Sequence, residues 1–293
     1  MMFEGFSDAS TDVDGVHIHA IKGGSGPALL LLHGHPQTHV IWHKVVPELV
    51  KRFTVIAADL RGYGDSGKPL GDENHLNYSK RRMALDQVKL MRHHGFDQFA
   101  VIGHDRGGRV AARMALDHQD AVTRLVTLDI APTLAMYEKT SFAFARAYWH
   151  WFMLVRPAPF PETLIRADPD LYLKQTMGAR SAGLAPFAPA AYAEYLRCVS
   201  HPDTAHGMCE DYRASITIDL EHDRASLSAQ QQITCPFTAL WGAQGVIAQC
   251  FDPLAEWRAY APHVEGEALP CGHYIPEEAP EALLERVLGF LTH

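Results

Sequence analysis

The segment Gly103-His-Asp-Arg-Gly-Gly108 brings together residue types that can do chemistry. It follows the apolar run Phe99–Ile102 and precedes a helical pattern over residues 109–117. A strand, a tight glycine turn and a helix form the setting of the nucleophile elbow, whose usual motif is G-x-S-x-G. Here Asp105 stands where serine is usual, so the sequence predicts a carboxylate nucleophile.

An aspartate at this position changes which bond can be attacked. A serine that displaced a group from saturated carbon would form an ether, and turnover would stop. An aspartate forms an alkyl ester that water can hydrolyse. Asp105 therefore indicates displacement at a saturated carbon that carries a leaving group. The alternative is an aspartate that only caps the following helix, which is common.

A nucleophile of this kind needs a base and an acid. His273 lies between a predicted last strand and the last helix, which agrees with the chain order nucleophile, acid, histidine. The turn Trp241–Gly245 contains no carboxylate, and we interpret Asp252 as a loop or helix-cap residue. Asp129 ends an apolar strand at the carboxyl edge of the sheet, so we assign it to orient His273.

Two arginines next to the elbow indicate an anionic substrate. Arg106 and Arg109 are three residues apart on the first helical turn, so both can face one site. The helix N-terminus also favours negative charge. The alternative is that one or both arginines form structural ion pairs. We expect the backbone N–H groups of His35 and Arg106 to form the oxyanion hole.

Composition excludes several classes of function. The 293 residues carry a formal charge of −8, which does not favour nucleic-acid binding. No signal peptide and no membrane span are evident. Five scattered cysteines predict reduced thiols and a cytoplasmic location. His33, His35, His39 and His43 lack a metal-ligand spacing, so we expect neither a metal nor another cofactor.

The pattern of apolar runs predicts an α/β fold with a mostly parallel, doubly wound sheet. We expect a helix that begins after Ser79 and stops at Gly95. A stretch rich in aromatics and prolines, without a convincing strand, follows the sixth strand. The predicted organisation is core 1–130, helical cap 131–226 and core 227–293. The expected strands and the final helix are Val16–Ile21, Ala28–Leu32, Phe53–Ala58, Phe99–Ile102, Leu125–Asp129, Phe237–Trp241 and Glu278–Leu291.

Nearly the whole chain resembles the haloacetate (fluoroacetate) dehalogenases of the α/β-hydrolase superfamily. Two segments specific to that group are GHDRGGR (103–109) and YWHW (148–151). Others that match are HGHPQTHVIWH (33–43), DLRGYGDSGKP (59–69), RAYWHW (146–151), ADPDLY (167–172), CEDYRA (209–214) and CGHYIPEEAP (271–280).

The resemblance implies hydrolysis of haloacetates to glycolate and halide through an ester on Asp105. It implies that Arg106 and Arg109 bind the substrate carboxylate, and that the protein is a homodimer. It places His150, Trp151 and Tyr212 around the halide, where their three donors would help fluoride to leave. We interpret Tyr148 and Trp149 as packing residues; without the resemblance, the whole YWHW segment would read equally well as an aromatic core.

The sequence departs from the family pattern at two places. Relatives commonly have H-G-F-P where this chain has His35, and they can carry a tryptophan within residues 174–189, where this chain has none. Because of these departures, the resemblance specifies the type of reaction but not the preferred substrate size or the rate.

Two other functions remain open. An epoxide hydrolase also uses an elbow aspartate, with tyrosines such as Tyr148, Tyr192, Tyr195 and Tyr212 to protonate the epoxide. The arginine pair speaks against it, because a neutral epoxide does not require two cations. A ligand receptor with little turnover is the other alternative, and an intact triad argues against that.

Overall fold

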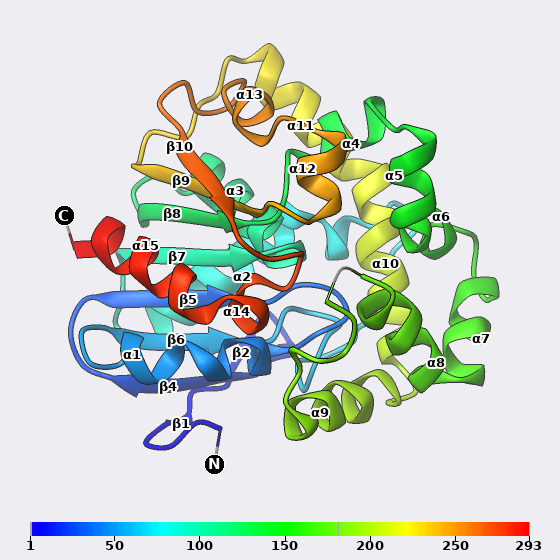
Figure 1. Ribbon diagram of the computed structural model, residues 1–293, viewed down its shortest axis with the longest axis horizontal. Helices are drawn as coiled ribbons and strands as arrows, with labels where there is room; N and C mark the ends of the chain where they lie inside the picture. The colour runs from blue at the N-terminus through cyan, green and yellow to red at the C-terminus, as the bar shows by residue number, and fades with distance from the viewer. Residues whose placement is uncertain (1, 181, 293) are drawn as a thin grey trace.

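A computed structural model describes residues 2–180 and 182–292 of the chain. Its centre is an eight-stranded sheet in the order β1-β4-β6-β5-β7-β8-β9-β10 (Figure 1). β1 and β4 run antiparallel to their neighbours, and the strands from β6 to β10 pair in parallel. The strands are β1 (Ser7–Asp8), β4 (Ala20–Gly24), β5 (Ala28–Leu32), β6 (Thr54–Ala58), β7 (Phe99–His104), β8 (Val122–Leu128), β9 (Phe237–Gly242) and β10 (Glu265–Leu269).

Helices cover both faces of this sheet, which explains why its inner strands are continuously apolar. In β5, Leu29 and Leu31 pack into one core cluster, while Leu30 and Leu32 pack into the other. The first cluster includes residues of α1 (Val46–Leu49), α14 (Ile275–Glu278) and α15 (Pro280–Thr292). The second includes residues of α2 (Lys80–His93) and α3 (Arg106–Asp117). The expected α/β fold with a mostly parallel sheet is confirmed.

Local signals placed several elements correctly. Ser79 caps α2 by accepting from the Arg82 N–H, and Gly95 follows the helix with φ of 83°. The expected strand Val16–Ile21 is wrong as a single element. It is divided at His19, whose backbone N–H donates to the Ser66 hydroxyl instead of to a strand. β3 (Val16–Ile18) therefore pairs with β2 (Thr11–Val13) in a separate hairpin.

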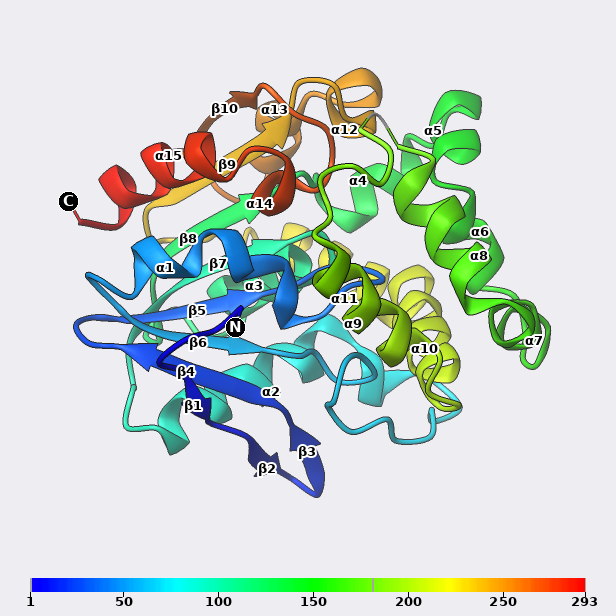
Figure 2. The same ribbon diagram turned by 60° about the horizontal axis from the view of Figure 1, so that its bottom comes forward.

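Between β8 and β9, the sixth and seventh strands of the sheet in chain order, the structure describes only helices and loops within residues 129–180 and 182–236. We call residues 133–228 the helical segment. Its helices are α4 (Thr133–Glu138), α5 (Phe142–Ala147), α6 (Trp149–Leu154), α7 (Phe160–Ala167), α8 (Pro169–Leu173), the π-turn η3 (Lys174–Gly178), α9 (Pro189–Val199), α10 (Thr204–Ile216) and α11 (Ile218–Ser228). Its part from α5 to α10 lies beyond the carboxyl ends of the parallel strands (Figures 1 and 2), whereas α11 contacts α3 through Asp223 and Ser226.

Four shorter helices complete the part that the structure describes. They are the 3₁₀ turns η1 (His39–Lys44) and η2 (Leu76–Tyr78), and the pair α12 (Val246–Cys250) and α13 (Pro253–Trp257) that follows β9. No helix within residues 2–180 or 182–292 combines the length and the apolar character that crossing a bilayer requires.

Candidate active site

Asp105 stands at the sharp turn between β7 and α3, with φ of 46°. Two glycines make this turn possible because the backbone passes itself closely. A Cβ at Gly103 would lie 2.4 Å from the Gly107 carbonyl oxygen, and a Cβ at Gly107 would lie 2.4 Å from that of Leu32. The Asp105 side chain makes no capping hydrogen bond to α3. A strained residue at a strand end, without a capping role, is typical of a functional position.

The two oxygens of the Asp105 carboxylate have different surroundings. Oδ1 accepts a hydrogen bond of 3.0 Å from the His35 backbone N–H, one of the two donors expected for the oxyanion hole. Oδ2 lies 3.9 Å from Nε2 of His273. Burial opposes ionisation of Asp105, but His273, His104 and the two arginines together hold its pKa below the usual value. The carboxylate is therefore ionised.

His273 and Asp129 are brought together as the sequence predicted. The Nδ1–H of His273 donates to Oδ2 of Asp129 at 2.6 Å, and Asp129 Oδ1 accepts from the Gly242 N–H at 2.9 Å. Burial, followed by the positive charge of Arg180, lowers the pKa of His273 to about 3, so its ring is neutral at neutral pH. Asp252 lies elsewhere, capping α13 through the Ala255 N–H. The geometry therefore favours Asp129 as the acid.

Arg106 is fully buried and makes an ion pair, the alternative that the sequence left open, with a partner that the sequence did not indicate. Its Nε and Nη2 donate to the Asp211 carboxylate on α10, at 2.7 and 2.8 Å. Lys80 also contacts that carboxylate, and Arg106 Nη2 contacts the Ser215 hydroxyl. Nη1 of Arg106 has no partner within the described residues. Arg106 therefore takes part in a structural ion pair through Nε and Nη2, while its Nη1 remains free to bind another group.

Protein contacts hold the Arg109 guanidinium less tightly than that of Arg106. Its Nη1 donates to the Ala131 carbonyl at 3.0 Å and to the Thr133 hydroxyl at 2.9 Å, and Nη2 meets only the sulfur of Met136. Its Nε has no partner among the residues that the structure describes. The guanidinium lies 4.7 Å above the Trp151 ring. Arg109 therefore has no carboxylate partner in the described part of the chain and can bind one from a substrate.

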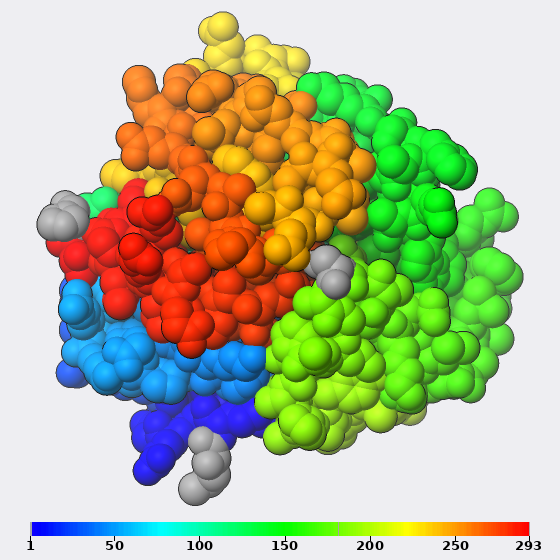
Figure 3. Space-filling model, in the orientation of Figure 1, coloured from blue at the N-terminus to red at the C-terminus, as the bar shows by residue number. Residues whose placement is uncertain are grey.

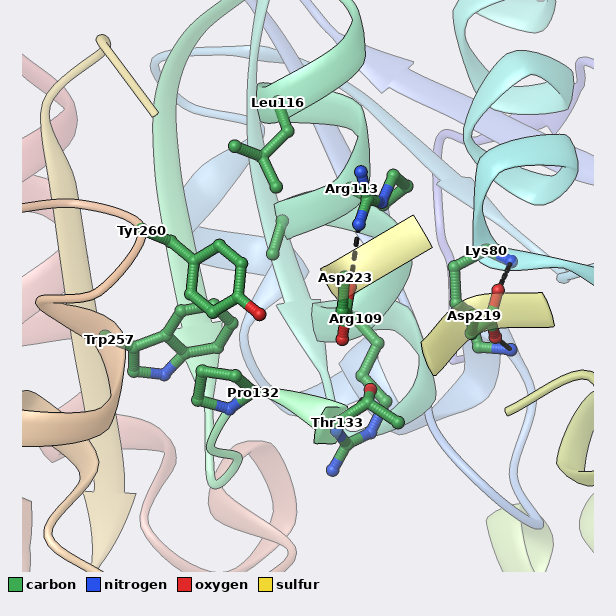
Figure 4. A pocket seen from close by; sticks show the side chains of 11 residues that line it. Lys80, Arg109, Arg113, Leu116, Pro132, Thr133, Asp219, Asp223, Trp257 and Tyr260 are labelled. Carbon is green, nitrogen blue, oxygen red and sulfur yellow. Dashed lines mark hydrogen bonds and ion pairs between the residues drawn. The ribbon is translucent and has the colours of Figure 1, made fainter. Parts of the chain in front are cut away.

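Figure 4 shows the side chains that line a small cavity, Arg109 among them. Lys80, Arg113, Asp219 and Asp223 line it, with the ion pair between Arg113 and Asp223 at 2.7 Å. Its volume of about 30 Å³ is sufficient for a water molecule or two. Its wall has three cationic side chains, counting Arg109, and two carboxylates, and the cavity is too small for an organic substrate.

The three residues expected around a halide lie together. His150, Trp151 and Tyr212 are all buried, and the ring of Tyr212 is 5.9 Å from that of His150 and 6.1 Å from that of Trp151. His150 Nδ1, Trp151 Nε1 and the Tyr212 hydroxyl each lack a hydrogen-bond partner within residues 2–180 and 182–292. Unsatisfied buried donors are rare, so three in one place indicate a site for an acceptor.

His35, the first departure from the family pattern, lies between these groups. Its ring stacks on His150 with the centroids 5.5 Å apart, and its Nε2 contacts the Tyr172 hydroxyl at 2.7 Å. Burial lowers its pKa to about 3, so it adds a polar but uncharged ring. His33 accepts from the Leu60 N–H and His39 pairs with Asp59 at 2.9 Å, so both have structural partners.

Tyr148 does more than the packing that the sequence indicated. Its hydroxyl lies 3.4 Å from Nδ1 of His273.

The sequence also contained no indication that Asp211, Lys80 and Arg180 belong to the site. Asp211 lies in the matching segment 209–214, but no signal distinguished it from the other charged residues of that segment. Only the packing of α10 against the elbow brings it to Arg106.

Comparison with known proteins agrees with this geometry. The family model described as alpha/beta hydrolase fold matches residues 27–280. A fluoroacetate dehalogenase from Burkholderia sp is 44% identical over 292 residues, which cover 99% of this chain and 95% of that protein. A soluble epoxide hydrolase from Corynebacterium sp. (strain C12) is 36% identical, over 96% of this chain and 95% of its own length.

A solved structure from Nostoc sp PCC 7120 superposes with a TM-score of 0.97 at 51% identity, and the match covers 100% of both chains. The chain therefore belongs to the haloacetate dehalogenase family of the α/β-hydrolase superfamily.

Proposed function

We propose that the protein hydrolyses haloacetates, including fluoroacetate and chloroacetate, to glycolate and halide. The observation that carries the proposal is the surroundings of Asp105: two arginines with free N–H groups and three buried donors without partners. Two cations suit a carboxylate, and neutral donors suit a departing halide. The 44% identity to a fluoroacetate dehalogenase also supports a reaction at a carbon–halide bond.

In the first step, Arg106 and Arg109 hold the substrate carboxylate while Oδ2 of Asp105 attacks the α-carbon. A C–O bond forms as the carbon–halogen bond breaks, and the halide leaves with the bonding electrons. His150, Trp151 and Tyr212 donate hydrogen bonds to the departing ion. Since these bonds strengthen as charge develops on the halide, they lower the barrier rather than merely tightening binding.

In the second step, water hydrolyses the ester. His273 Nε2 takes a proton from water, whose oxygen attacks Cγ of Asp105, and Asp129 stabilises the imidazolium. The N–H groups of His35 and Arg106 hold the oxyanion. Collapse of the tetrahedral intermediate restores the carboxylate and releases glycolate, which receives the proton from His273. The sum is haloacetate plus water giving glycolate, halide and one proton, without a metal or another cofactor.

A single turnover in H₂¹⁸O tests this route. With enzyme in excess over chloroacetate, the glycolate should contain no label, because its new oxygen comes from Asp105. The label should instead appear in the peptide that contains Asp105. Labelled glycolate in the first turnover would mean direct attack by water and would refute the ester.

Epoxide hydrolysis is the second candidate. The Tyr148 and Tyr212 hydroxyls both lie at the site, and the chain is 36% identical to a soluble epoxide hydrolase. Tyr192 and Tyr195 do not support it, since their hydroxyls donate to Asp170 and Glu277. Diol formation from styrene oxide at a rate above that of halide release would favour this candidate. Halide release with very slow diol formation would exclude it as the main activity.

We propose further that residues 131–226 act as a cap over a core made of residues 1–130 and 227–293, and that the enzyme is a cytoplasmic homodimer. The position of α5 to α10 beyond the strand ends supports the cap (Figure 2).

All five cysteines are unpaired, as a reducing compartment favours. Exposed Phe142, Phe160, Leu164 and Leu171 on the helical segment supply apolar surface for a second copy. Light scattering at several protein concentrations tests the dimer.

A further inference from the structure

The candidate active site is buried, so a substrate needs a route to it. Asp105 and His273 are only 3% and 2% exposed. A cavity of about 200 Å³ connects exposed side chains with His273. Ala147, Ala179, Gln244 and Gln249 are the exposed residues of its wall, and Arg180, Gly245, Val246 and His273 complete it. It lies where the helical segment meets α12, on the seam between the green and the orange parts of Figure 3.

Arg180 is the one cationic side chain in the wall of this cavity that carries its charge at neutral pH, since the ring of His273 is neutral. Its Nε donates to the Thr176 carbonyl at 2.9 Å, which fixes the direction of the side chain. The guanidinium carbon lies 4.5 Å from the ring centre of Tyr148 and 5.5 Å from that of Tyr274. Both tyrosines contact His273. Arg180 is therefore directed toward the catalytic base.

No carboxylate within residues 2–180 and 182–292 forms an ion pair with Arg180. Arg106 and Arg113 each form an ion pair with an aspartate, whereas Arg180 forms none within the described residues. Its buried Nη1 has no hydrogen-bond partner there either. Stacking on two aromatic rings offsets part of the cost of burying this charge. An uncompensated cation beside a cavity attracts small anions.

We propose that Arg180 is the first anion-binding residue on the substrate route: it captures the carboxylate of the haloacid in this cavity and passes it inward to Arg106 and Arg109. The inference rests on the proposed haloacetate substrate. A neutral substrate such as an epoxide or an amide gains nothing from Arg180, so the residue selects anions before they reach Asp105.

The test compares Arg180→Gln and Arg180→Lys with Arg166→Gln. Arg166 is an exposed arginine of α7 that donates to the Pro202 carbonyl, so Arg166→Gln removes one charge from the helical segment without touching the cavity. Arg180→Gln should lower kcat/KM for chloroacetate about tenfold, while alkylation of Asp105 at saturating substrate stays within about twofold of wild type. Arg180→Lys should recover most of the loss, and Arg166→Gln should show none.

Charge dependence separates capture from a packing role. For wild type, kcat/KM should fall between about 0.01 M and about 1 M salt, because the Debye length falls from about 30 Å to about 3 Å. Arg180→Gln should show a weaker salt dependence and should process neutral chloroacetamide as wild type does. Equal losses for chloroacetate and chloroacetamide, or a loss confined to the saturated rate, would overturn the proposal.

Acetate gives a measurement that does not depend on turnover. It has no leaving group, and its association can be followed by stopped-flow tryptophan fluorescence. Slower association in Arg180→Gln supports the capture role even if wild type released no chloride, which would refute the proposed function alone. Association at the wild-type rate in an enzyme that does release chloride would overturn the role of Arg180 alone.

Discussion

The Arg106 guanidinium and the Asp211 carboxylate form a two-point ion pair that joins the nucleophile elbow to the helical segment, with Nε–Oδ2 and Nη2–Oδ1 distances of 2.7 and 2.8 Å. Both side chains are fully buried. Since two nitrogens of Arg106 are fixed by Asp211, the free Nη1 has a defined direction. Asp211 thereby positions an arginine of the proposed carboxylate site without touching the substrate.

We expect Asp211→Asn to weaken both the protein and substrate recognition. It leaves Arg106 buried without its counter-charge and Lys80 with Asp219 as its partner, so the free energy of unfolding should fall by about 3 kcal/mol in urea titrations. In the folded fraction, kcat/KM for chloroacetate should fall more than that for chloroacetamide. Asp223→Asn is the control, because it breaks the neighbouring pair with Arg113 outside the site. Equal effects on the two substrates would contradict the positioning role.

Asp105→Ala should abolish halide release and leave the fold intact, because its side chain makes no capping bond to α3. Asp252→Ala is the matched control, since Asp252 does cap a helix, through the Ala255 N–H. The control should lose about 0.5–2 kcal/mol of stability and keep its activity. Ion chromatography of released halide and urea titration measure the two effects. Halide release near the wild-type rate by Asp105→Ala would end the nucleophile hypothesis.

His273→Asn should separate the two chemical steps. Attack on the α-carbon requires no base, whereas attack by water on the ester does. One equivalent of chloride should therefore be released, and mass spectrometry should find a carboxymethyl group on the peptide containing Asp105. Full turnover in this variant, or an adduct on another residue, would be incompatible with the two-step route.

The pH dependence follows from the environment of His273, which faces Asp105, Asp129, Arg109, Arg180 and the rings of Tyr148, Tyr274 and His104. Burial and Arg180 lower its pKa to about 3. The neutral ring is the active form, so a lowered pKa keeps the base active at lower pH, and activity is lost as pH falls through that value. The acidic limb of the rate of ester hydrolysis should lie well below pH 6.5. Arg180→Gln should move it upward, and a limb near pH 6.5 in wild type would contradict this reasoning.

Trp151→Phe should affect fluoroacetate more than chloroacetate. The substitution keeps an aromatic ring and removes a buried N–H group that has no protein partner in the described residues. Fluoride accepts stronger hydrogen bonds than chloride and leaves from a stronger bond. The difference between the two losses should be on the order of 1–2 kcal/mol for one hydrogen bond, measured by single-turnover alkylation.

Trp42→Phe serves as the control for Trp151→Phe. Trp42 is also buried, and its N–H group has no partner within the described residues. It lies in the core cluster beside α1 and not at the candidate active site. Trp42→Phe should affect the two substrates alike. Equal losses for both acids in Trp151→Phe would mean that Trp151 only packs against its neighbours.

The sequence by itself predicted most strands of the parallel sheet and a set of candidate reacting groups. Continuous apolar runs marked strands covered on both faces, and Ser79 and Gly95 marked the limits of α2. The glycines around Asp105 predicted the elbow, because only glycine permits the close backbone passage found there. Chain order and the end of β8 were sufficient to select Asp129 and His273. These features are local, so they can be read from neighbouring residues.

The tertiary structure decided what the charges and aromatic rings do. Asp211, Arg180 and Tyr148 come from α10, the turn after η3 and the loop between α5 and α6, and only the packing of the helical segment brings them to Arg106 and His273. The position of His19 between two separate strands likewise depends on Ser66, 47 residues away. Contacts between distant segments have no periodicity or motif, so the sequence contains no local signal for them. Whether a buried charge has a partner is settled by packing alone.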